Sequence, residues 1–310
     1  MKIVTLTMNP ALDKSTSIDT LQARKKLRCS YPRYEPGGGG INVSRAIKIL
    51  GGESLAVFAA GGFAGEQIKD LLKEEGVEYK CIKTKNPTRE NLVVLEKSTD
   101  NQYRFGMPGK EVDNAEQNEC LDYIEQLPDN FEFLIASGSL PPGVPDDYYG
   151  TVAKIAYKKN LKCIVDTSGE ALTSAAESGV CLLKPNLREL SSLSKKDEIY
   201  GLEQEEIAQE IIKKGSANIL VVSLGARGAM LVTKDKIKYV IPPTVKQKST
   251  VGAGDSMVAA IVLSMSRGED LFEAVKWGVA AGTAATMTPG SELCRKEDVE
   301  KIYEWISKRD

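Results

Sequence analysis

Short β-rich runs alternate with helical patterns along most of the chain, and this alternation limits the fold more than any other feature. The runs are typical of buried strands at 2–7, 54–60, 131–137, 161–166, 181–185 and 218–223. Between them, apolar residues recur at helical spacing around 43–50, 64–75, 146–158 and 204–214. Such alternation predicts an α/β core, a mostly parallel sheet with helices on both faces. Ligands of these folds bind beyond the carboxyl ends of the strands.

Two stretches break the pattern. Residues 14–34 and 88–107 read as short polar strands without a helix between them. They predict a small sheet that projects from the core and acts as a lid over a cleft. The apolar face of that sheet would need cover from a partner subunit or a ligand. Because no internal repeat or low-complexity linker is present, we expect residues 1–310 to form a single domain in which lid and core are interwoven.

Composition excludes several classes of function. The formal net charge of −2 gives no general attraction to nucleic acid or to an anionic membrane, so we expect neither partner. The start, MKIVTLTMNPALD, becomes polar too soon for a secretory signal, and no apolar run could span a bilayer, which predicts a cytoplasmic protein. Histidine is absent, which removes Ser-His-Asp and Cys-His pairs and histidine-ligated metals. A general base must therefore be a carboxylate, Lys, Tyr or Cys.

The stretch TVGAGDSMVAA at 250–260 places an acid directly behind two glycines. A tight turn into a helix explains one glycine and the acid. The other glycine and the small residues also fit an anion site, in which the amides of Gly252, Ala253 and Gly254 face a phosphate at a helix start. Spacing alone leaves both interpretations open. By elimination Asp255 is the leading candidate base, and an ordinary Asp pKa of about 4 would leave it ionised at neutral pH.

A second glycine cluster, EPGGGGINVSRA at 35–46, runs straight into a helical pattern. Four consecutive glycines are costly in a plain structural turn, so they favour a ligand that contacts the backbone while Asn42 binds its hydroxyl groups. Asp13, in NPALD, is expected at the carboxyl end of the first strand, facing the cleft, although a turn acid has the same pattern. Four basic residues are expected on the lid strands, namely Lys26, Arg28, Arg89 and Arg104. Together they could hold a phosphate, while each alone reads as a solvated charge.

Two further motifs have both a structural and a ligand-binding interpretation. In KPNLRE, Asn186 and Glu189 stand three apart after a strand, which suits water-mediated Mg²⁺ binding as well as a helix cap. In SLGARGA at 223–229, a glycine turn between two strands could cradle a phosphate or only reverse the chain. Neither GxxxxGK[ST] nor GxGxxG is present, so the P-loop and dinucleotide-binding classes lack their residues.

Together these motifs resemble those of the PfkB, or ribokinase-like, carbohydrate kinases. Five occur in the family's order: GGGGINVSRA, AGGFAGE, KPNLREL, VSLGARGA and STVGAGDSMVA. Within the family the chain is most similar to the sugar-phosphate kinases, and most of all to the minor-type ATP-dependent 6-phosphofructokinases, through NPALD, KLRCS, PTREN, QYRFGMPG and SGSLPPG. Fructose-1-phosphate and tagatose-6-phosphate kinases commonly carry GGKGIN where this chain has GGGGIN, so Gly39 favours fructose 6-phosphate.

The resemblance implies a ribokinase-like three-layer core with a small β-sheet lid. It implies phosphorylation of fructose 6-phosphate at its 1-hydroxyl by ATP and Mg²⁺, giving fructose 1,6-bisphosphate. Asp255 would take the proton of the hydroxyl, and the amides of 252–254 would form the anion hole. Most of the catalysis would then come from positioning and charge stabilisation.

The resemblance also assigns the remaining site residues. The sugar and its phosphate would be held by Asp13, Gly38, Gly39, Asn42, Arg89, Arg104 and Ser137, with Lys26 and Arg28 acting across a dimer. The nucleotide side comprises Lys184, Asn186, Ser223, Gly225, Gly228 and Gly254, with Glu189 near Mg²⁺. A loop for a monovalent cation such as K⁺ would use backbone oxygens around Ser249, Val251, Ala285 and Gly290.

Several rival interpretations follow from the same residues. Tagatose 6-phosphate or fructose 1-phosphate is the alternative substrate. A non-catalytic sugar-phosphate sensor is the alternative of a different class, but Asp255 and its glycines are intact. A dehydrogenase would need GxGxxG after the first strand, where TMNPALD stands. The likeness, with apolar lid residues such as Leu92 and Val94, also predicts a homodimer formed through the lid.

Overall fold

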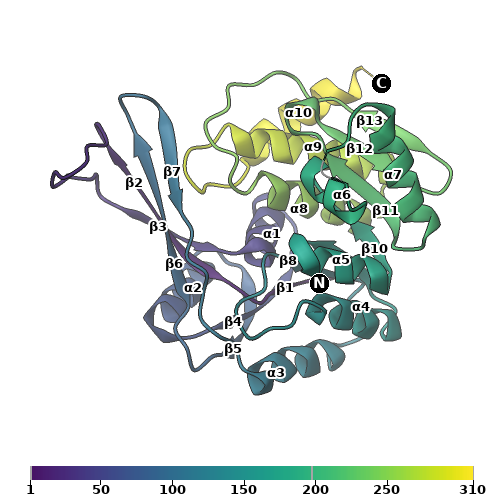
Figure 1. The fold of residues 1–310 in the computed structure, drawn as a ribbon, viewed down its shortest axis with the longest axis horizontal. Helices are drawn as coiled ribbons and strands as arrows, with labels where there is room; N and C mark the ends of the chain where they lie inside the picture. The colour runs from purple at the N-terminus through teal and green to yellow at the C-terminus, as the bar shows by residue number, and fades with distance from the viewer. Residues whose placement is uncertain (1, 197, 310) are drawn as a thin grey trace.

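The computed structural model describes residues 2–196 and 198–309, and its largest element is a nine-stranded sheet (Figure 1). Its strands are β1 (Ile3–Thr7), β4 (Leu55–Ala60), β5 (Glu78–Lys83), β8 (Phe133–Ser137), β9 (Lys162–Asp166), β10 (Val180–Leu183), β11 (Ala217–Ser223), β12 (Ala229–Val232) and β13 (Ile237–Val240). The spatial order is β13-β12-β11-β10-β9-β8-β1-β4-β5. Neighbours from β11 to β5 are parallel, while β12 and β13 run antiparallel at one edge.

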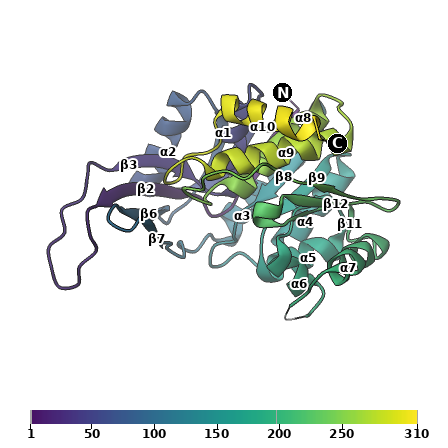
Figure 2. The same cartoon turned by 90° about the horizontal axis from the view of Figure 1, so that it is seen from above.

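Helices cover both faces of this sheet. They are α1 (Gly39–Ile49), α2 (Gly62–Glu74), α3 (Asn114–Glu125), α4 (Tyr148–Lys158), α5 (Gly169–Ser178), α6 (Leu187–Leu193), α7 (Leu202–Lys213), α8 (Ala253–Ser266), α9 (Leu271–Thr286) and α10 (Lys296–Ser307). Figure 2 shows α1, α8, α9 and α10 on one side of the sheet and α4 to α7 on the other. None of the helices in the described part of the chain is long and apolar enough to cross a membrane.

The core is built from strands that are buried on both faces. In β1, Val4 and Leu6 belong to the apolar cluster under α3 to α7, while Ile3 belongs to the cluster under α1 and α8 to α10. Successive side chains of a strand point to opposite faces, so a continuous apolar run fills both layers. This explains why the six predicted strands and four predicted helices are found, and the prediction of a three-layer α/β core is confirmed.

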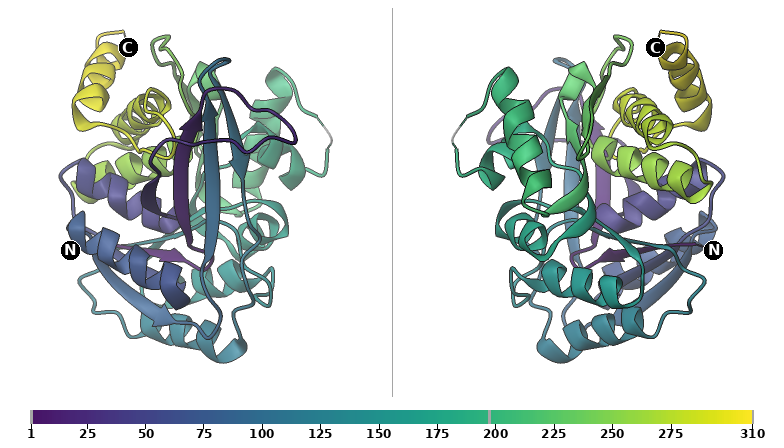
Figure 3. Two further views of the ribbon diagram at one scale, coloured as in Figure 1. Left: turned by 90° about the vertical axis from the view of Figure 1, so that its left-hand side faces the viewer. Right: turned by 90° about the vertical axis from the view of Figure 1, so that its right-hand side faces the viewer.

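A second, four-stranded sheet projects from the core (Figures 1 and 3). Its strands are β2 (Ala11–Ile18), β3 (Arg33–Gly37), β6 (Arg89–Glu96) and β7 (Asn101–Phe105), in the order β3-β2-β6-β7. The pair β2 and β6 is parallel, and the two outer pairs are antiparallel. Each predicted polar stretch therefore contributes to this sheet, although β2 begins at Ala11 rather than at residue 14.

One expectation for this sheet is wrong. Lys26 and Arg28 do not lie on strands but on the loop at 19–32 between β2 and β3, where both are exposed. This loop projects away from the core (Figure 2). Its sequence is rich in charged and polar residues and lacks the alternation of a half-buried strand, which explains why the ladder ends at Ile18 and resumes at Arg33.

Candidate active site

The α8 helix begins at a backbone turn that only glycine fits well. Gly252 has φ 70°, in the left-handed region, and a Cβ added there would lie 2.5 Å from Leu293 Cδ2. The free amides of the first turn of α8 follow directly, and Asp255 is the acidic residue of that turn. Both interpretations of the glycine–acid stretch are therefore compatible with the structure, because the turn also leaves a positive helix end.

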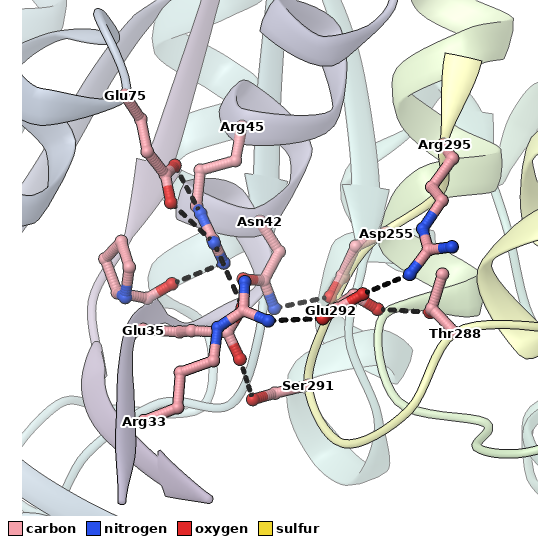
Figure 4. A network of polar contacts seen from close by, with 11 residues as sticks. Arg33, Glu35, Asn42, Arg45, Glu75, Asp255, Thr288, Ser291, Glu292 and Arg295 are labelled. Atoms are coloured by element: carbon pink, nitrogen blue, oxygen red, sulfur yellow. Dashed lines mark hydrogen bonds and ion pairs between the residues drawn. The ribbon is translucent and has the colours of Figure 1, made fainter. Parts of the chain in front are cut away.

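Asn42 meets Asp255 at the junction of two helices. Its Nδ2 donates a 2.9 Å hydrogen bond to Asp255 Oδ2, and α1 and α8 pack against each other along their apolar faces (Figure 4). Asn42 is 8% exposed, so this amide is buried at the contact between the two helices. The two glycine clusters, far apart in the sequence, therefore open onto the same carboxylate.

The Asp255 carboxyl has an unusual protonation equilibrium. Burial raises its pKa to about 7, and the negative charge of Asp166 adds to the shift. The Asn42 hydrogen bond and the charge of Lys184 act in the opposite direction. The expectation of an ordinary Asp pKa is therefore wrong, because it took no account of burial and of a second carboxylate nearby. A pKa near neutrality suits a general base.

Asp166, the last residue of β9, is a site residue that the sequence analysis missed. Its Oδ1 lies 3.2 Å from Lys184 Nζ, and both side chains are largely buried. Burial disfavours the Lys184 ammonium, but the adjacent Asp166 carboxylate outweighs this effect and holds the lysine pKa above its usual value. A Cβ at Gly254 would lie 3.3 Å from Lys184 Nζ. The ammonium therefore lies against the first turn of α8.

The KPNLRE motif forms the start of a helix. Asn186 is the N-cap of α6, and its side chain accepts a 2.9 Å hydrogen bond from the Glu189 amide. The Glu189 carboxylate accepts in return from the Asn186 amide at 2.8 Å, which completes a capping box. Burial raises the pKa of Glu189. The cap interpretation is thus correct, and Glu189 keeps one carboxylate oxygen for a further partner.

The SLGARGA motif reverses the chain between β11 and β12. Ser223, at the end of β11, forms a parallel bridge with Asn186, which aligns the two nucleotide-side motifs. Gly225 and Gly228 both have positive φ, and a Cβ at Gly228 would lie 1.9 Å from Val240 O. The turn therefore requires glycine for its own packing, whether or not a phosphate contacts it.

The glycines at the start of α1 lie against the carboxyl ends of β8 and β1. A Cβ at Gly39 would lie 2.3 Å from Ser137 Oγ and 2.6 Å from the Gly138 amide nitrogen. At Gly38, which has φ 113°, a Cβ would lie 2.8 Å from Thr7 Cγ2. Ser137 is 1% exposed. Close backbone approach, rather than loop flexibility, is what these glycines provide.

Asp13 lies on a strand of the small sheet, so its expected place at the carboxyl end of the first strand is wrong. It is the third residue of β2, because the chain turns sharply after β1 and enters the other sheet. Asn91 Nδ2 donates a 2.8 Å hydrogen bond to Asp13 Oδ1, and burial raises the Asp13 pKa. A Cβ at Gly37 would lie 2.2 Å from Asp13 Oδ2, so the glycine leaves room for this carboxylate.

Arg89 on β6 and Arg104 on β7 contact different segments. Arg89 donates to the backbone oxygens of Met107 at 2.7 Å and Asn9 at 3.0 Å, while its Nε is buried without a partner among the described residues. Arg104 reaches from β7 to the segment before α8 and donates to Thr250 Oγ1 at 3.1 Å. Arg89 thus reaches the segment between β1 and β2 and Arg104 reaches the segment before α8, whereas Lys26 and Arg28 lie on the projecting loop.

The four residues of the expected cation loop come from two segments that lie side by side. Ser249 Oγ donates a 2.8 Å hydrogen bond to Gly290 O and a 3.2 Å hydrogen bond links it to the Val251 amide. Ala285 O accepts from Thr288 Oγ1 at 2.7 Å. Ala285 O also accepts from the Thr288 amide at 3.3 Å, so both of its lone pairs are used, whereas Gly290 O lies beside Ser249 in the segment that leads into α8.

Two helices that begin at glycines meet at a buried carboxylate, beside a small sheet that carries arginines. This arrangement is that of a class of sugar kinases, and the family comparison agrees. The profile described as "pfkB family carbohydrate kinase" matches residues 3–298, so the chain belongs to the pfkB family of carbohydrate kinases. It is an ATP-dependent sugar kinase, and the family resemblance found in its motifs is confirmed.

Two relatives indicate which kind of sugar kinase this chain resembles. The chain is 45% identical over 303 residues to the ATP-dependent 6-phosphofructokinase isozyme 2 of Mycobacterium tuberculosis, which covers 98% of this chain and 89% of that protein. It is 43% identical over 309 residues to the isozyme 2 of Escherichia coli, with 99% and 100% covered. The crystal structure of the E. coli phosphofructokinase-2 in complex with substrates and products matches with a TM-score of 0.94 over 99% and 100% of the chains, at 43% identity. The same E. coli protein has been solved in complex with potassium and in a tetrameric inhibited form, at 43% identity, TM-scores of 0.94 and 0.92, and 99% coverage of both chains.

Proposed function

We propose that this kinase transfers the terminal phosphoryl group of ATP to the 1-hydroxyl of fructose 6-phosphate, giving fructose 1,6-bisphosphate. The observation that carries the proposal is the hydrogen bond between Asn42 and Asp255, which joins the sugar-side helix to the phosphoryl-side helix at one carboxylate. The relatives at 43% and 45% identity are 6-phosphofructokinases, which supports the choice of substrate.

In the proposed reaction, Asp255 accepts the proton of the 1-hydroxyl while the sugar oxygen forms its bond to the terminal phosphorus and the bond to the ADP oxygen breaks. The amides of Gly252, Ala253 and Gly254 stabilise the charge on the transferred group at the positive end of α8. Lys184, beside Gly254, places a fixed positive charge at the same point. Positioning and electrostatic stabilisation then supply most of the rate increase.

The sugar side of the site is assigned to the glycine turn and the small sheet. Gly38, Gly39 and Asn42 approach the sugar hydroxyls from the start of α1, and Asp13 from β2. Arg89, Arg104 and Ser137 bind the existing phosphate. The buried Nε of Arg89, which has no partner among the described residues, supports this role, because a charged donor without an acceptor is costly unless a ligand supplies one.

The nucleotide side is assigned to the ends of β10 and β11. Lys184, Asn186, Ser223, Gly225 and Gly228 contact the nucleotide, and the carboxylates of Asp166 and Glu189 hold Mg²⁺, which neutralises phosphate charge when bound. The donors fit this ion, since Mg²⁺ in kinases is held by one or two carboxylates together with substrate phosphates. Carbonyls of Ser249, Val251 and Gly290 are the proposed ligands of K⁺.

The small sheet is also the proposed dimer interface. Val94 is only 8% exposed within one chain, so it offers little surface to a partner. The proposed interface therefore uses other apolar residues, among them Leu21 and Tyr31 on the loop at 19–32, which are 44% and 96% exposed. The same loop would present Lys26 and Arg28 to the partner's cleft. Sedimentation velocity tests this proposal, since a monomer at micromolar concentration contradicts it.

An ATP-consumption assay tests the proposed function. We expect the highest kcat/KM with fructose 6-phosphate, compared with tagatose 6-phosphate, fructose 1-phosphate and unphosphorylated fructose. A higher value with either other sugar phosphate would keep the mechanism and change the substrate. No turnover with any of the four would contradict the assignment and favour a sensor.

A further inference from the structure

A buried polar cluster lies beside the proposed active site, and none of the proposed steps uses it. Its centre is Glu35 of β3, which is only 3% exposed (Figure 4). Glu35 Oε2 accepts a 2.6 Å hydrogen bond from Ser291 Oγ, and Oε1 lies 3.5 Å from a guanidinium nitrogen of Arg45 and 3.5 Å from one of Arg33. A buried ion pair adds little net stability, so a cluster of this kind is more informative about specific positioning than about fold stability.

On one side the cluster fixes the helix that carries Asn42. Arg45 stands one turn further along α1 and is 6% exposed. It donates to Pro36 O at 2.9 Å and to both carboxylate oxygens of Glu75 at 2.7 Å each. Bidentate pairs of this kind hold a planar guanidinium in one orientation. The cluster therefore fixes the end of β3 against α1, immediately before the sugar-side glycines.

The same strand places Glu35 directly opposite Asp13. The two residues are register partners in the antiparallel pair of β2 and β3, and the Glu35 charge contributes to the raised pKa of Asp13. The cluster is thus in direct contact with both elements that are proposed to bind the sugar.

On the other side the cluster holds the segment between α9 and α10. Ser291 follows Gly290, whose carbonyl accepts the hydrogen bond from Ser249. Two residues after Ser291, Leu293 packs against Gly252, where it occupies the space that a Cβ would take. A shift of this segment would therefore move the turn that starts α8.

An outer ion pair joins the same two segments at the surface. Glu292 pairs with Arg33 and, at 3.1 Å, with Arg295, but both arginine side chains are more than half exposed. Exposed pairs contribute little. The buried bond between Glu35 and Ser291 is the part of this junction that can hold a fixed geometry.

We propose that Glu35 and Ser291 are a positioning pair that couples the sugar-binding turn to the anion hole. Through this pair, closure of the sugar side around its ligand sets the segment that supports Gly252, and the phosphoryl side acts back on the sugar side by the same amount. The inference rests on the proposed function. It adds that sugar phosphate and nucleotide bind more tightly together than separately, and that this bond carries the coupling.

Two variants and two controls test the pair. Ser291→Ala removes the hydroxyl, and Ser291→Thr restores it in the conservative form. Ser178→Ala removes a comparable hydroxyl hydrogen bond, to Ser174 O at the end of α5, and Glu292→Gln removes the outer ion pair of the same segment. For each protein, calorimetry gives the Kd of fructose 6-phosphate with and without a non-hydrolysable ATP analogue and Mg²⁺, and steady-state assays give kcat and KM.

In the wild type we expect the nucleotide analogue to tighten sugar-phosphate binding by about fivefold or more. In Ser291→Ala this factor should fall towards one. At an assay temperature well below the melting temperature, kcat should fall by about tenfold, because misplaced reacting groups react more slowly. Ser291→Thr should keep both values, as should the two controls.

Other results would overturn the pair. One is a wild type without coupling, and another is a Ser291→Ala protein with the wild-type coupling factor. A third is a Ser291→Ala protein whose melting temperature falls while kcat and coupling stay unchanged, which would indicate a purely structural role. Failure of the proposed function is seen separately, as a wild type that binds but does not turn over any sugar phosphate.

Discussion

Asn42 Nδ2 lies 2.9 Å from Asp255 Oδ2, and this contact opposes the effect of burial on the same carboxyl. Burial favours the protonated acid, whereas a donated hydrogen bond favours the carboxylate. The balance leaves the Asp255 pKa at about 7, so the group can both accept a proton and release it near neutral pH. Asn42 therefore has two proposed roles: contact with the sugar and control of the base.

The Asp255→Asn enzyme should fold and lose activity. An amide keeps the shape of the side chain but cannot take the hydroxyl proton, so kcat should fall by about 10²-fold or more. Steady-state assays with fructose 6-phosphate measure the loss. Asp122→Asn, an exposed acid on α3, is the matched control and should retain full activity. Near-normal turnover by folded Asp255→Asn would refute the role of the base.

The same Asp255→Asn substitution should stabilise the protein at high pH. The folded-state pKa of about 7 is above the ordinary 3.8, so the contribution of this carboxyl to stability is fully present below the lower value and is lost as pH rises through the higher one. Asparagine does not titrate. The melting temperature of Asp255→Asn relative to the wild type should therefore be higher at about pH 8 than at about pH 5, by a few degrees. A gap that does not change with pH would contradict the raised pKa.

The pH dependence of kcat/KM should follow the same group. Below a pH of about 7, activity should decline because the base becomes protonated. Asn42→Ala removes the hydrogen bond that lowers the pKa, so its profile should be displaced to higher pH. Substrate phosphates titrate near pH 6 in both enzymes, so the difference between the two profiles reports on Asp255. Superimposable profiles would show that Asn42 does not control this titration.

The sequence was sufficient for the layers of the core because each buried strand is a continuous apolar run with helical patterns between. It was less informative where two sheets meet. The chain leaves β1 at Thr7 and enters the other sheet at Ala11, which no local pattern indicates, and this explains the error over Asp13. The polar segment at 19–32 was mistaken for strand because it lies between residues that do form strands.

Site residues could be predicted where the residue type itself indicated the role. They could not be predicted where the role depends on a neighbouring residue. Asp255 and Asn42 follow glycine clusters, and the absence of histidine from the sequence left few other candidate bases. Asp166 was missed, although its place as the last residue of a predicted strand, at the ligand-binding edge of the sheet, was a usable signal. The pKa of Asp255 could not be foreseen, because it depends on the burial and charges that tertiary packing supplies.

Gly39 has no room for a side chain in this structure unless its neighbours move. In Gly39→Ala, the new Cβ would lie 2.3 Å from Ser137 Oγ and 2.6 Å from the Gly138 nitrogen, so the turn before α1 must move. Because this turn is proposed to hold the sugar, the KM for fructose 6-phosphate should rise by about tenfold or more. Gly106→Ala is the matched control, since a Cβ there has no atom within 4 Å and the backbone is not in the left-handed region. Both variants are assayed at saturating ATP, and an unchanged KM in Gly39→Ala would show that the sugar does not depend on this close approach.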